Sequence, residues 1–446
     1  MIRTARRHVP IVPLAIACGW LWQGTVGAAP AAANEPAPGA QPSALDTLLS
    51  APVLDPNLLE RAVLERNPSL AAARAGFRES SARADRTGAL MNPMVEGMVA
   101  PRALGNEEIA APGYIVDFSV NLSLFGQRGA EKKAAQAESR ATGADLRATQ
   151  LDLLREARRL YYGFFLVERG LEVNQELKGL LGQFRSVALQ KYAAGLVGQE
   201  DALRADVELA MLDHQAIVLG RERRIVRARV NALLHRAPGE ALPVPADSLP
   251  DPREGEESPG SLEAALTRPE VMRAEAERDA WGAERSVAKK RRLPDFTLLA
   301  RYDAMEAEHE MRPMVGAGIS LPLWFGSLGA GEREAAAGYE QKEQERLAAI
   351  DRARAEIEEA RARVEETRHE IHVVETGVLP ATERALASIR AGYESNRSDF
   401  LALLNAERDL ARARLDWNRA RAEYRMALVD WERAIARGAL PEEETR

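Results

Sequence analysis

The sequence predicts a mainly α-helical protein in which a unit of helix, β-hairpin and helix occurs twice in tandem. Matching residues show the duplication: Pro68 and Pro269, Pro93 and Pro294, and Tyr192 and Tyr393. The members of each pair lie 201 residues apart (269 − 68, 294 − 93 and 393 − 192). Self-similarity at a fixed spacing indicates one duplicated supersecondary unit rather than two unrelated domains.

The composition favours long helices over a compact enzyme core, because 28% of the residues are charged and only 5% are aromatic. No glycine-rich phosphate loop, nucleophile elbow or HExxH motif is present, so we expect neither an enzyme nor a cofactor. The many carboxylates lie beside arginines at helical spacing, where they serve as solubilising charge.

Residues 1–29 are predicted to be a secretory signal peptide. Arg3, Arg6 and Arg7 precede an apolar stretch, and small residues follow it, so cleavage is expected after Ala28 or Ala29. Removing the three arginines changes the formal net charge from −7 to −10. The mature protein is therefore acidic, and nucleic acid is not an expected partner.

The only cysteine is Cys18, which falls inside the predicted signal peptide. Cleavage after Ala28 or Ala29 leaves a mature chain without thiol or disulfide. The alternative is lipidation of Cys18, since Ala15-Ile16-Ala17-Cys18 distantly resembles the bacterial lipoprotein cleavage box. Leucine is missing from that box and the apolar run continues past Cys18, so signal-peptide cleavage is favoured.

Composition divides the rest of the chain into five segments. Residues 30–54 are expected to form a flexible leader rich in alanine and proline, and residues 238–260 a proline-rich linker between the copies. The first repeat is expected at 55–237 and the second at 261–436, with an acidic tail at 437–446.

Heptad spacing of small and apolar residues predicts helices that pack closely along seams. The first seam comprises Ala130, Ala134, Ala137, Ala141, Ala144, Ala148 and Leu151. Copy two has two seams: Ile350, Ala353, Ile357, Ala360, Val364, Thr367, Ile371 and Val374, then Leu403, Ala406, Leu410, Ala413, Trp417, Ala420, Tyr424 and Ala427. No proline occurs from Arg128 to Gln190, so a helix on the order of 90 Å long is expected there.

Alternating apolar and polar residues predict one β-hairpin in each copy. The alternation covers residues 116–124 and 315–323, and a shorter candidate strand precedes each, at 94–100 and 296–303. The hairpins are therefore expected at about 94–125 and 296–325. Such alternation also occurs at the edge of a soluble sandwich.

A membrane role would have to use these strands, because no apolar window beyond Ala33 reaches the 18 to 20 or so residues of a membrane helix. A tilted strand of about 10 residues can cross an outer membrane with apolar side chains toward lipid. Two hairpins supply too few strands to close a barrel. Since backbone groups in hydrocarbon must be paired, several chains would have to share one barrel.

Four motifs carry a family resemblance: Leu90-Met91-Asn92-Pro93, Ser123-Leu124-Phe125-Gly126, Leu323-Trp324-Phe325-Gly326 and Tyr192-Ala193-Ala194-Gly195. With their spacing, they resemble the TolC-like outer-membrane factors of tripartite efflux and secretion systems, from about Asp55 to Ile435. The motifs are somewhat more similar to the heavy-metal efflux branch than to the drug-efflux branch.

The resemblance implies a homotrimer in the bacterial outer membrane. Its chains would form a transmembrane twelve-stranded β-barrel that continues into the periplasm as a long α-helical barrel. It also implies a passive exit duct that works with a periplasmic adaptor, or membrane fusion protein, and an inner-membrane pump, expected to be of the resistance-nodulation-division type. The alternatives are a type I protein secretion conduit of the same fold and a periplasmic coiled-coil scaffold or adaptor without a pore.

Two turns in equivalent positions are the candidate functional sites, named by Tyr192, Gly195, Tyr393, Asn396, Arg397 and Asp399. Glycine and asparagine readily adopt left-handed backbone angles, so both sites are expected to join paired helices. The resemblance implies that these turns form the periplasmic tip, where the gate lies and adaptors dock. The chain departs from the family pattern at Ser398, Ala402 and Asn405, where the family's tip arginine and two acidic positions would fall.

No metal site is expected. His369 and His372 lie three apart at helical spacing and are weak candidates, because no third ligand is evident. Residues 305–311 contain methionine, glutamate and histidine, but an ordinary polar loop explains them better.

Overall fold

The computed structural model describes residues 43–89, 91–100, 113–195, 198–250, 262–304, 312–395 and 397–437. The predicted signal peptide with Cys18, most of the leader, part of the linker and nearly all of the acidic tail lie outside these ranges, as do Asn396 and residues 305–311.

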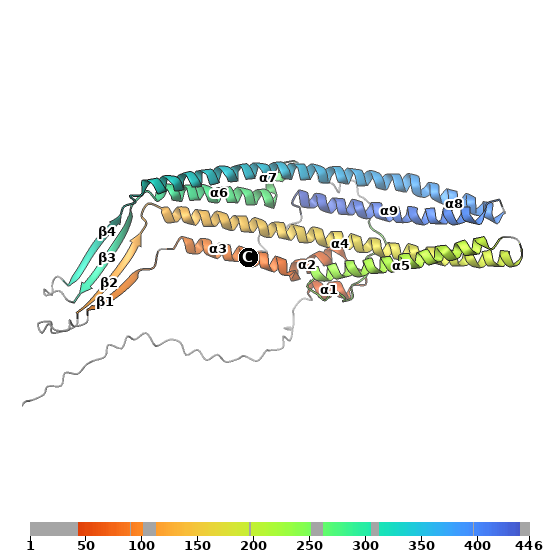
Figure 1. Cartoon of the computed structure of the whole chain (residues 1–446), viewed down its shortest axis with the longest axis horizontal. Helices are drawn as coiled ribbons and strands as arrows, with labels where there is room; N and C mark the ends of the chain where they lie inside the picture. Colours follow the sequence, from red (N-terminus) through yellow and green to blue (C-terminus); the bar gives the residue numbers. More distant parts are fainter. Residues whose placement is uncertain are drawn as a thin grey trace, which may run out of the picture. The chain divides into compact units, whose positions relative to one another are not determined.

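Helices make up most of the described chain (Figure 1). The α-helices are α1 (Ala44–Ser50), α2 (Pro56–Arg66), α3 (Pro68–Thr87), α4 (Gln127–Ala193), α5 (Glu200–Leu233), α6 (Pro269–Lys290), α7 (Phe325–Val373), α8 (Leu379–Glu394) and α9 (Phe400–Ala434). A 3₁₀ helix, η1 (Leu262–Thr267), precedes α6, and a π-helical turn, η3 (Val374–Val378), joins α7 to α8. Within the described ranges, none of the helices has both the length and the apolar composition needed to cross a membrane.

The two long helices α4 and α7 have shorter helices packed along them (Figure 1). Near the strands, the order of neighbours is α3, α4, α6 and α7. Toward the helical turns, the order is α5, α4, α9 and α8. From the strands toward the helical turns, α3 and then α5 pack along one side of α4. On the other side, α6 and then α9 lie between α4 and α7. The predicted unbroken helix in copy one is confirmed as α4, which has 67 residues.

Polar side chains connect the shorter helices where they meet. Asn67 caps α3, because its Oδ1 accepts a hydrogen bond from the Ser69 N–H at 2.9 Å. Its Nδ2 donates to the Leu233 carbonyl at the end of α5, at 3.0 Å. In the second copy, Arg433 of α9 donates to Glu270 of α6 at 2.5 Å and to Asp152 of α4 at 2.7 Å. The joint between α3 and α5 thus satisfies a backbone carbonyl at a helix end, and the joint between α6 and α9 pairs charged side chains. These groups would otherwise be left unpaired.

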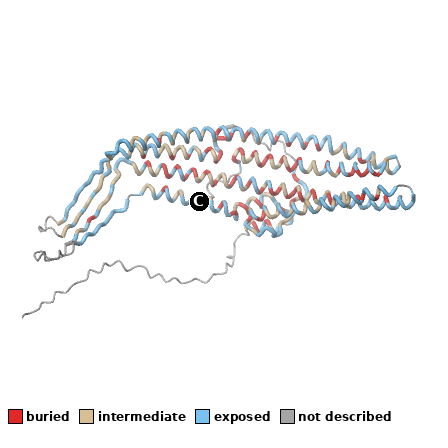
Figure 2. The backbone as a smooth tube through the Cα atoms, viewed as in Figure 1, coloured by how far each residue is buried: buried red, intermediate tan, exposed pale blue. Residues whose placement is uncertain are grey.

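The predicted seams form the contact faces between helices. In the first seam every residue except the half-buried Ala148 is buried, and in the second copy only Ala360 and Trp417 are half-buried. Figure 2 shows these buried positions running along the helices, whereas the strands are mostly exposed. Alanine lets the helix axes approach closely. Larger side chains, including Phe164 and Phe165, fill a separate core against α1 and α2.

The four strands form one antiparallel sheet in the order β1 (Met94–Ala100), β2 (Gly113–Leu122), β3 (Asp295–Asp303) and β4 (Pro313–Ser320). The small antiparallel sheet beside many helices confirms that part of the predicted fold. The second strand of each hairpin ends earlier than the predicted Leu124 and Leu323. After β4, Pro322 lacks the N–H that would extend the ladder. After β2, Gly126 turns the chain at φ 71°.

The π-helical turn η3 was not predicted, although the repeat spacing carries its signal. The Phe-Gly pairs that precede α4 and begin α7 are 200 residues apart (326 − 126), whereas the tyrosines at the far helix ends are 201 apart (393 − 192). Copy two therefore holds one more residue between these motifs. A π-helical turn takes up an extra residue, because its hydrogen bonds span i to i+5 instead of i to i+4.

Candidate functional site

The strand register places a continuous set of apolar side chains on one face of the sheet. Phe118 is paired with Val95 and Ala300, and Ala300 is paired with Val315, so these four side chains share one face. The apolar face comprises Val95, Val99, Val116, Phe118, Val120, Leu298, Ala300, Val315, Ala317 and Ile319. It is uncovered, and Val315 is 91% exposed. An exposed apolar surface of this kind marks contact with a membrane or another protein.

The opposite face carries the polar side chains of the sheet together with apolar residues such as Met98, Ile115 and Leu299. Asp117 accepts two hydrogen bonds from the Arg301 guanidinium, at 2.6 and 2.8 Å. Next along the strands, the Thr297 hydroxyl donates to Asn121 Oδ1 at 2.7 Å. Cross-strand pairing of this kind neutralises charge while keeping the face hydrophilic.

Both outer strands of the sheet have an open edge. Among the described residues, β1 pairs with β2 only and β4 pairs with β3 only. Each edge therefore presents a row of unpaired backbone N–H and C=O groups, which a further strand could satisfy.

The turn between α4 and α5 contains two of the predicted site residues. Gly195 has a φ of 70°, in the left-handed region, and its N–H donates to the Tyr192 carbonyl at 2.9 Å. Glycine permits this angle without a clash. Tyr192 is 46% exposed. The structure thus assigns Gly195 to the turn geometry and leaves Tyr192 accessible on the surface.

The equivalent turn between α8 and α9 is held by its backbone. The Arg397 N–H donates to the Gly392 carbonyl at 2.7 Å, and Arg397 Nε donates to the Ser395 hydroxyl at 3.0 Å. Asp399 caps α9 by accepting from the Ala402 N–H at 2.7 Å. Asn396, the fourth candidate in this turn, lies outside the described residues.

The two turns contact each other through an aromatic ring and an ammonium group. Lys191 Nζ, in the last turn of α4, lies 4.2 Å from the ring centroid of Tyr393. Tyr393 also packs against Phe400, with ring centroids 6.4 Å apart, and Phe400 packs on Phe184. The sequence singled out Tyr393 but not Lys191. The sequence carries no local signal for this partner, because the contact depends on how the two helical hairpins pack.

Below this contact is a small apolar core composed of Leu181, Ala205, Phe400 and Leu404. Burial raises the pKa of Asp201, and the nearby carboxylates of Glu200 and Asp399 raise it further, whereas Arg204 and Lys191 lower it. The turns therefore combine an apolar core with a rim that carries both signs of charge.

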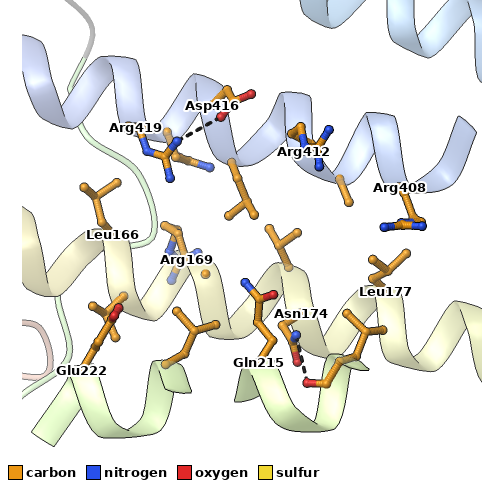
Figure 3. A pocket seen from close by; sticks show the side chains of 18 of the residues that line it. Leu166, Arg169, Asn174, Leu177, Gln215, Glu222, Arg408, Arg412, Asp416 and Arg419 are labelled. Atoms are coloured by element: carbon orange, nitrogen blue, oxygen red, sulfur yellow. Dashed lines mark hydrogen bonds and ion pairs between the residues drawn. The ribbon is translucent and has the colours of Figure 1, made fainter. Parts of the chain in front are cut away.

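An open groove lies farther from the turns, between α4, α5 and α9 (Figure 3). Leu166 and Leu177 contribute its apolar wall on α4, and α9 lines it with Arg408, Arg412 and Arg419. The Asn174 side chain donates to the Leu212 carbonyl at 3.2 Å and links the α4 and α5 walls. The groove therefore has an apolar wall and a charged side, on which Arg408 pairs with Glu208 at 3.1 Å and Arg419 pairs with Asp416 at 3.3 Å.

His369 and His372 are both exposed on α7. Within the described part of the chain, no group of three or more metal-ligating side chains occurs.

The model of a known family, the outer membrane efflux protein family, matches residues 59–234 and 261–437. The chain belongs to the outer membrane efflux protein family. Members of this family are outer-membrane channels and not enzymes. The family confirms the predicted resemblance to TolC-like outer-membrane factors and the predicted outer-membrane location with a periplasmic extension.

Several efflux proteins resemble this family member along most of its length. The cobalt-zinc-cadmium resistance protein CzcC of Cupriavidus metallidurans is 23% identical over 305 residues, which cover 67% of this chain and 71% of CzcC. The CusC structure superimposes with a TM-score of 0.75 at 18% identity, covering 90% of this chain and 96% of CusC. The outer-membrane channel OprN gives a TM-score of 0.72 at 23% identity, covering 86% and 91% of the two chains.

Proposed function

We propose that this efflux protein is the passive exit duct of a tripartite pump and works as a homotrimer. The observation that carries this proposal is the four-stranded sheet with one wholly apolar face and two open edges. Lipid would cover the apolar face, and the polar face with Asp117 and Arg301 would line a water-filled lumen. The edges would pair between copies, because unpaired backbone groups are costly in hydrocarbon.

The strand count supports three copies. Two copies would supply eight strands, and the interior of an eight-stranded barrel is about filled by its own side chains. Three copies supply twelve strands and are the smallest number that leaves an open lumen. The helices of the three copies would continue this lumen into the periplasm as a helical barrel.

The helical turns are the proposed gate and adaptor-docking region. Tyr393 and Lys191 would hold the two turns of each copy together in the closed state. Exposed turn residues, including Tyr192 and Arg397, would meet a periplasmic adaptor. Gly195, Asn396 and Asp399 would keep the turns in the shape that docks. An inner-membrane pump, of the resistance-nodulation-division type, would supply the energy.

The proposed cargo is a divalent transition-metal cation. The curated relative CzcC is named for resistance to cobalt, zinc and cadmium. No metal-binding cluster occurs among the described residues, which suits a conduit that passes its cargo without retaining it.

Planar bilayer recording and metal tolerance test this function together. The purified protein in detergent should have the mass of a trimer and should form ion-conducting pores. A strain that lacks the gene should lose tolerance to zinc, cobalt or cadmium and regain it when the gene is restored. A monomer without conductance would overturn the duct, whereas a conducting trimer with unchanged metal tolerance would overturn only the cargo.

A further inference from the structure

Four consecutive cationic residues lie where α6 meets the sheet. Lys289 and Lys290 end α6, Arg291 and Arg292 follow, and β3 begins at Asp295. Cations near a helix C-terminus interact favourably with the helix dipole, but this effect falls off within the last turn. The dipole therefore accounts for the two lysines in the last turn of α6 and not for the two arginines after it. We call these four residues the junction cluster.

Half of the junction cluster is bound within the fold and half is not. Arg292 Nη2 pairs with Glu332 of α7 at 2.9 Å, and Lys290 donates a hydrogen bond to a backbone carbonyl. Lys289 and Arg291 are exposed, and neither has an ion-pair partner within the part of the chain that the structure describes. These two side chains are therefore available to an anion from outside the protein.

Positive charge is concentrated at this level of the molecule. Residues 289–295 hold the junction cluster and one carboxylate, Asp295, so their net charge is +3 (4 − 1). The first two turns of α4, residues 127–134, hold Arg128, Lys132 and Lys133 with one carboxylate, Glu131, so their net charge is +2 (3 − 1). The whole chain has a formal net charge of −7, so the positive charge here is a local feature.

An apolar collar lies at the same end of the sheet. It consists of exposed residues that precede α4 and α7, namely Leu124, Phe125, Leu323 and Trp324. The ring centroids of Phe125 and Phe296 are 6.0 Å apart, and Phe296 is paired with Ile319 of the apolar face. The collar therefore continues the apolar face toward the helices. Trp324 is 82% exposed, and tryptophan is enriched where a protein meets the surface of a membrane.

The junction cluster and the collar lie at one level. Lys290 Nζ is 2.8 Å from the carbonyl oxygen of Gly126, the residue after Phe125. Arg292 precedes β3 by three residues (295 − 292), which is about 10 Å at most. The headgroup layer on each side of a bilayer is about 5 to 8 Å thick, and long cationic side chains extend along apolar surface to reach it. Where lipid covers the apolar face, the cluster is therefore at the depth of the lipid phosphates.

We propose that the junction cluster binds the phosphate groups of anionic phospholipids in the periplasm-facing leaflet of the outer membrane. The inference rests on the proposed function, because it requires lipid on the apolar face of the sheet. The helices would extend into the periplasm, so the helical end of the sheet would lie in the leaflet on that side. Each lipid would place its phosphate against Lys289 and Arg291 and its acyl chains beside Phe125 and Trp324.

Charge complementarity would make the site selective for phosphatidylglycerol over zwitterionic lipids. A cation beside an anionic membrane surface increases binding by on the order of fivefold at low salt. The two unpaired cations, Lys289 and Arg291, therefore predict a preference on the order of tenfold. The collar favours a lipid as the occupant over an acidic protein, because it adds an exposed apolar surface that is continuous with the apolar face of the sheet.

Quenching of Trp324 fluorescence by brominated lipids measures this preference. The intact protein is reconstituted in phosphatidylcholine vesicles that contain equal minor fractions of either brominated phosphatidylglycerol or brominated phosphatidylcholine. Subtracting the signal of Trp324→Phe isolates Trp324 from the other tryptophans. Brominated phosphatidylglycerol should compete about tenfold better for the site, and high salt should reduce this advantage because it screens exposed charges.

Removing the two unpaired cations tests the cluster itself. Lys289→Gln with Arg291→Gln should bring the preference to within about twofold of equal. Arg224→Gln with Arg352→Gln is the matched control, because it removes the same charge from exposed positions on α5 and α7 away from the sheet and should keep the preference. Lys289→Arg with Arg291→Lys keeps the charge and should also keep it. A native preference in the first variant would overturn the site.

The outcomes separate this site from the duct. Ion-conducting pores without a preference for phosphatidylglycerol would overturn the lipid site and leave the duct intact. If neither brominated lipid quenches Trp324, lipid does not reach the collar, and both the site and the lipid-facing assignment of the sheet are wrong. If inorganic phosphate or polyglutamate, each at the concentration of the lipid, displaces phosphatidylglycerol, the cluster is a general anion site or a surface for an acidic protein, and the proposal is wrong.

Discussion

The Lys191 ammonium lies 4.2 Å from the centre of the Tyr393 ring and thereby joins the two helical turns of the chain. Lys191 belongs to the first repeat and Tyr393 to the second. This contact therefore joins the two repeats of one chain at the helix ends farthest from the sheet. A cation over an aromatic ring at an exposed site contributes about 0.5 to 1 kcal/mol. In the proposed gate, a contact of this size would hold the closed state while leaving it easy to open.

The first prediction concerns this contact. Lys191→Met should raise the fraction of time that single channels conduct in planar bilayers, because the turns lose their attraction. Tyr393→Leu should act in the same direction, whereas Tyr393→Phe keeps the ring and should behave like the unmodified protein. An equal conducting fraction in all four proteins would show that the contact has no part in gating.

The sheet faces make a second prediction. Phe118→Arg places a charge on the apolar face and should greatly reduce the amount of protein in the outer membrane, since arginine facing the middle of a bilayer costs about 2 to 4 kcal/mol. Ser119→Arg, one residue along the same strand, points to the polar face and should insert normally. The amount of each variant in outer-membrane fractions tests which face of the sheet meets lipid. An equal loss of both variants would argue against a lipid-facing side.

The third prediction concerns the small apolar core at the turns. Leu404 is 2% exposed, so Leu404→Ala should lower the free energy of unfolding by about 2 to 5 kcal/mol. Leu401, on the same helix, is 38% exposed, and Leu401→Ala should change stability by less than about 0.5 kcal/mol. Thermal melts followed by helical circular dichroism compare the two variants. Similar melting temperatures would mean that this core contributes little.

A fourth prediction follows from the joint between α6 and α9. Burial raises the pKa of Glu270, but hydrogen bonding and attraction from Arg433 outweigh burial and leave the pKa below its usual value. A carboxyl group with a lowered pKa in the folded state stabilises the fold above its unfolded pKa, and this stability is lost as the pH falls through the folded value.

The melting temperature of the unmodified protein should therefore fall more steeply between pH 6 and pH 3 than that of Glu270→Gln. Other carboxyl groups titrate in both proteins, so the difference between the two curves is the relevant quantity. Parallel curves would show that the Glu270 and Arg433 pair does not contribute to acid sensitivity.

The fifth prediction concerns the π-helical turn. Deleting Gly377 should convert the turn to a regular α-helix, because it removes the extra residue while both flanks keep their packed faces. Helical content should stay unchanged. Deleting Arg361, an exposed residue in the regular part of α7, should instead rotate one flank by about 100° and disrupt packing. Loss of folding in both deletions would mean that the turn is required for the fold.

The sequence was most informative where a regular spacing persists over many residues. The seam from Ile350 to Val374 could be identified because heptad spacing reports which side of a helix is covered. The contact of Lys191 with Tyr393 could not, because their approach depends on how two helical hairpins pack, which no local spacing encodes. The capping role of Asp399 was visible in principle, since aspartate often precedes an apolar helix start.

At the level where α3 meets α5 and α6 meets α9, the helices α4 and α7 continue without a break. Each place where two shorter helices meet end to end is therefore spanned by a long helix packed beside it. No cross-section cuts through joints alone, so bending here would require distorting an intact hydrogen-bonded helix. In the described stretch of α7 to α8, the α-helical bonding pattern changes at η3, so we expect the helix to bend there in the proposed gating motion.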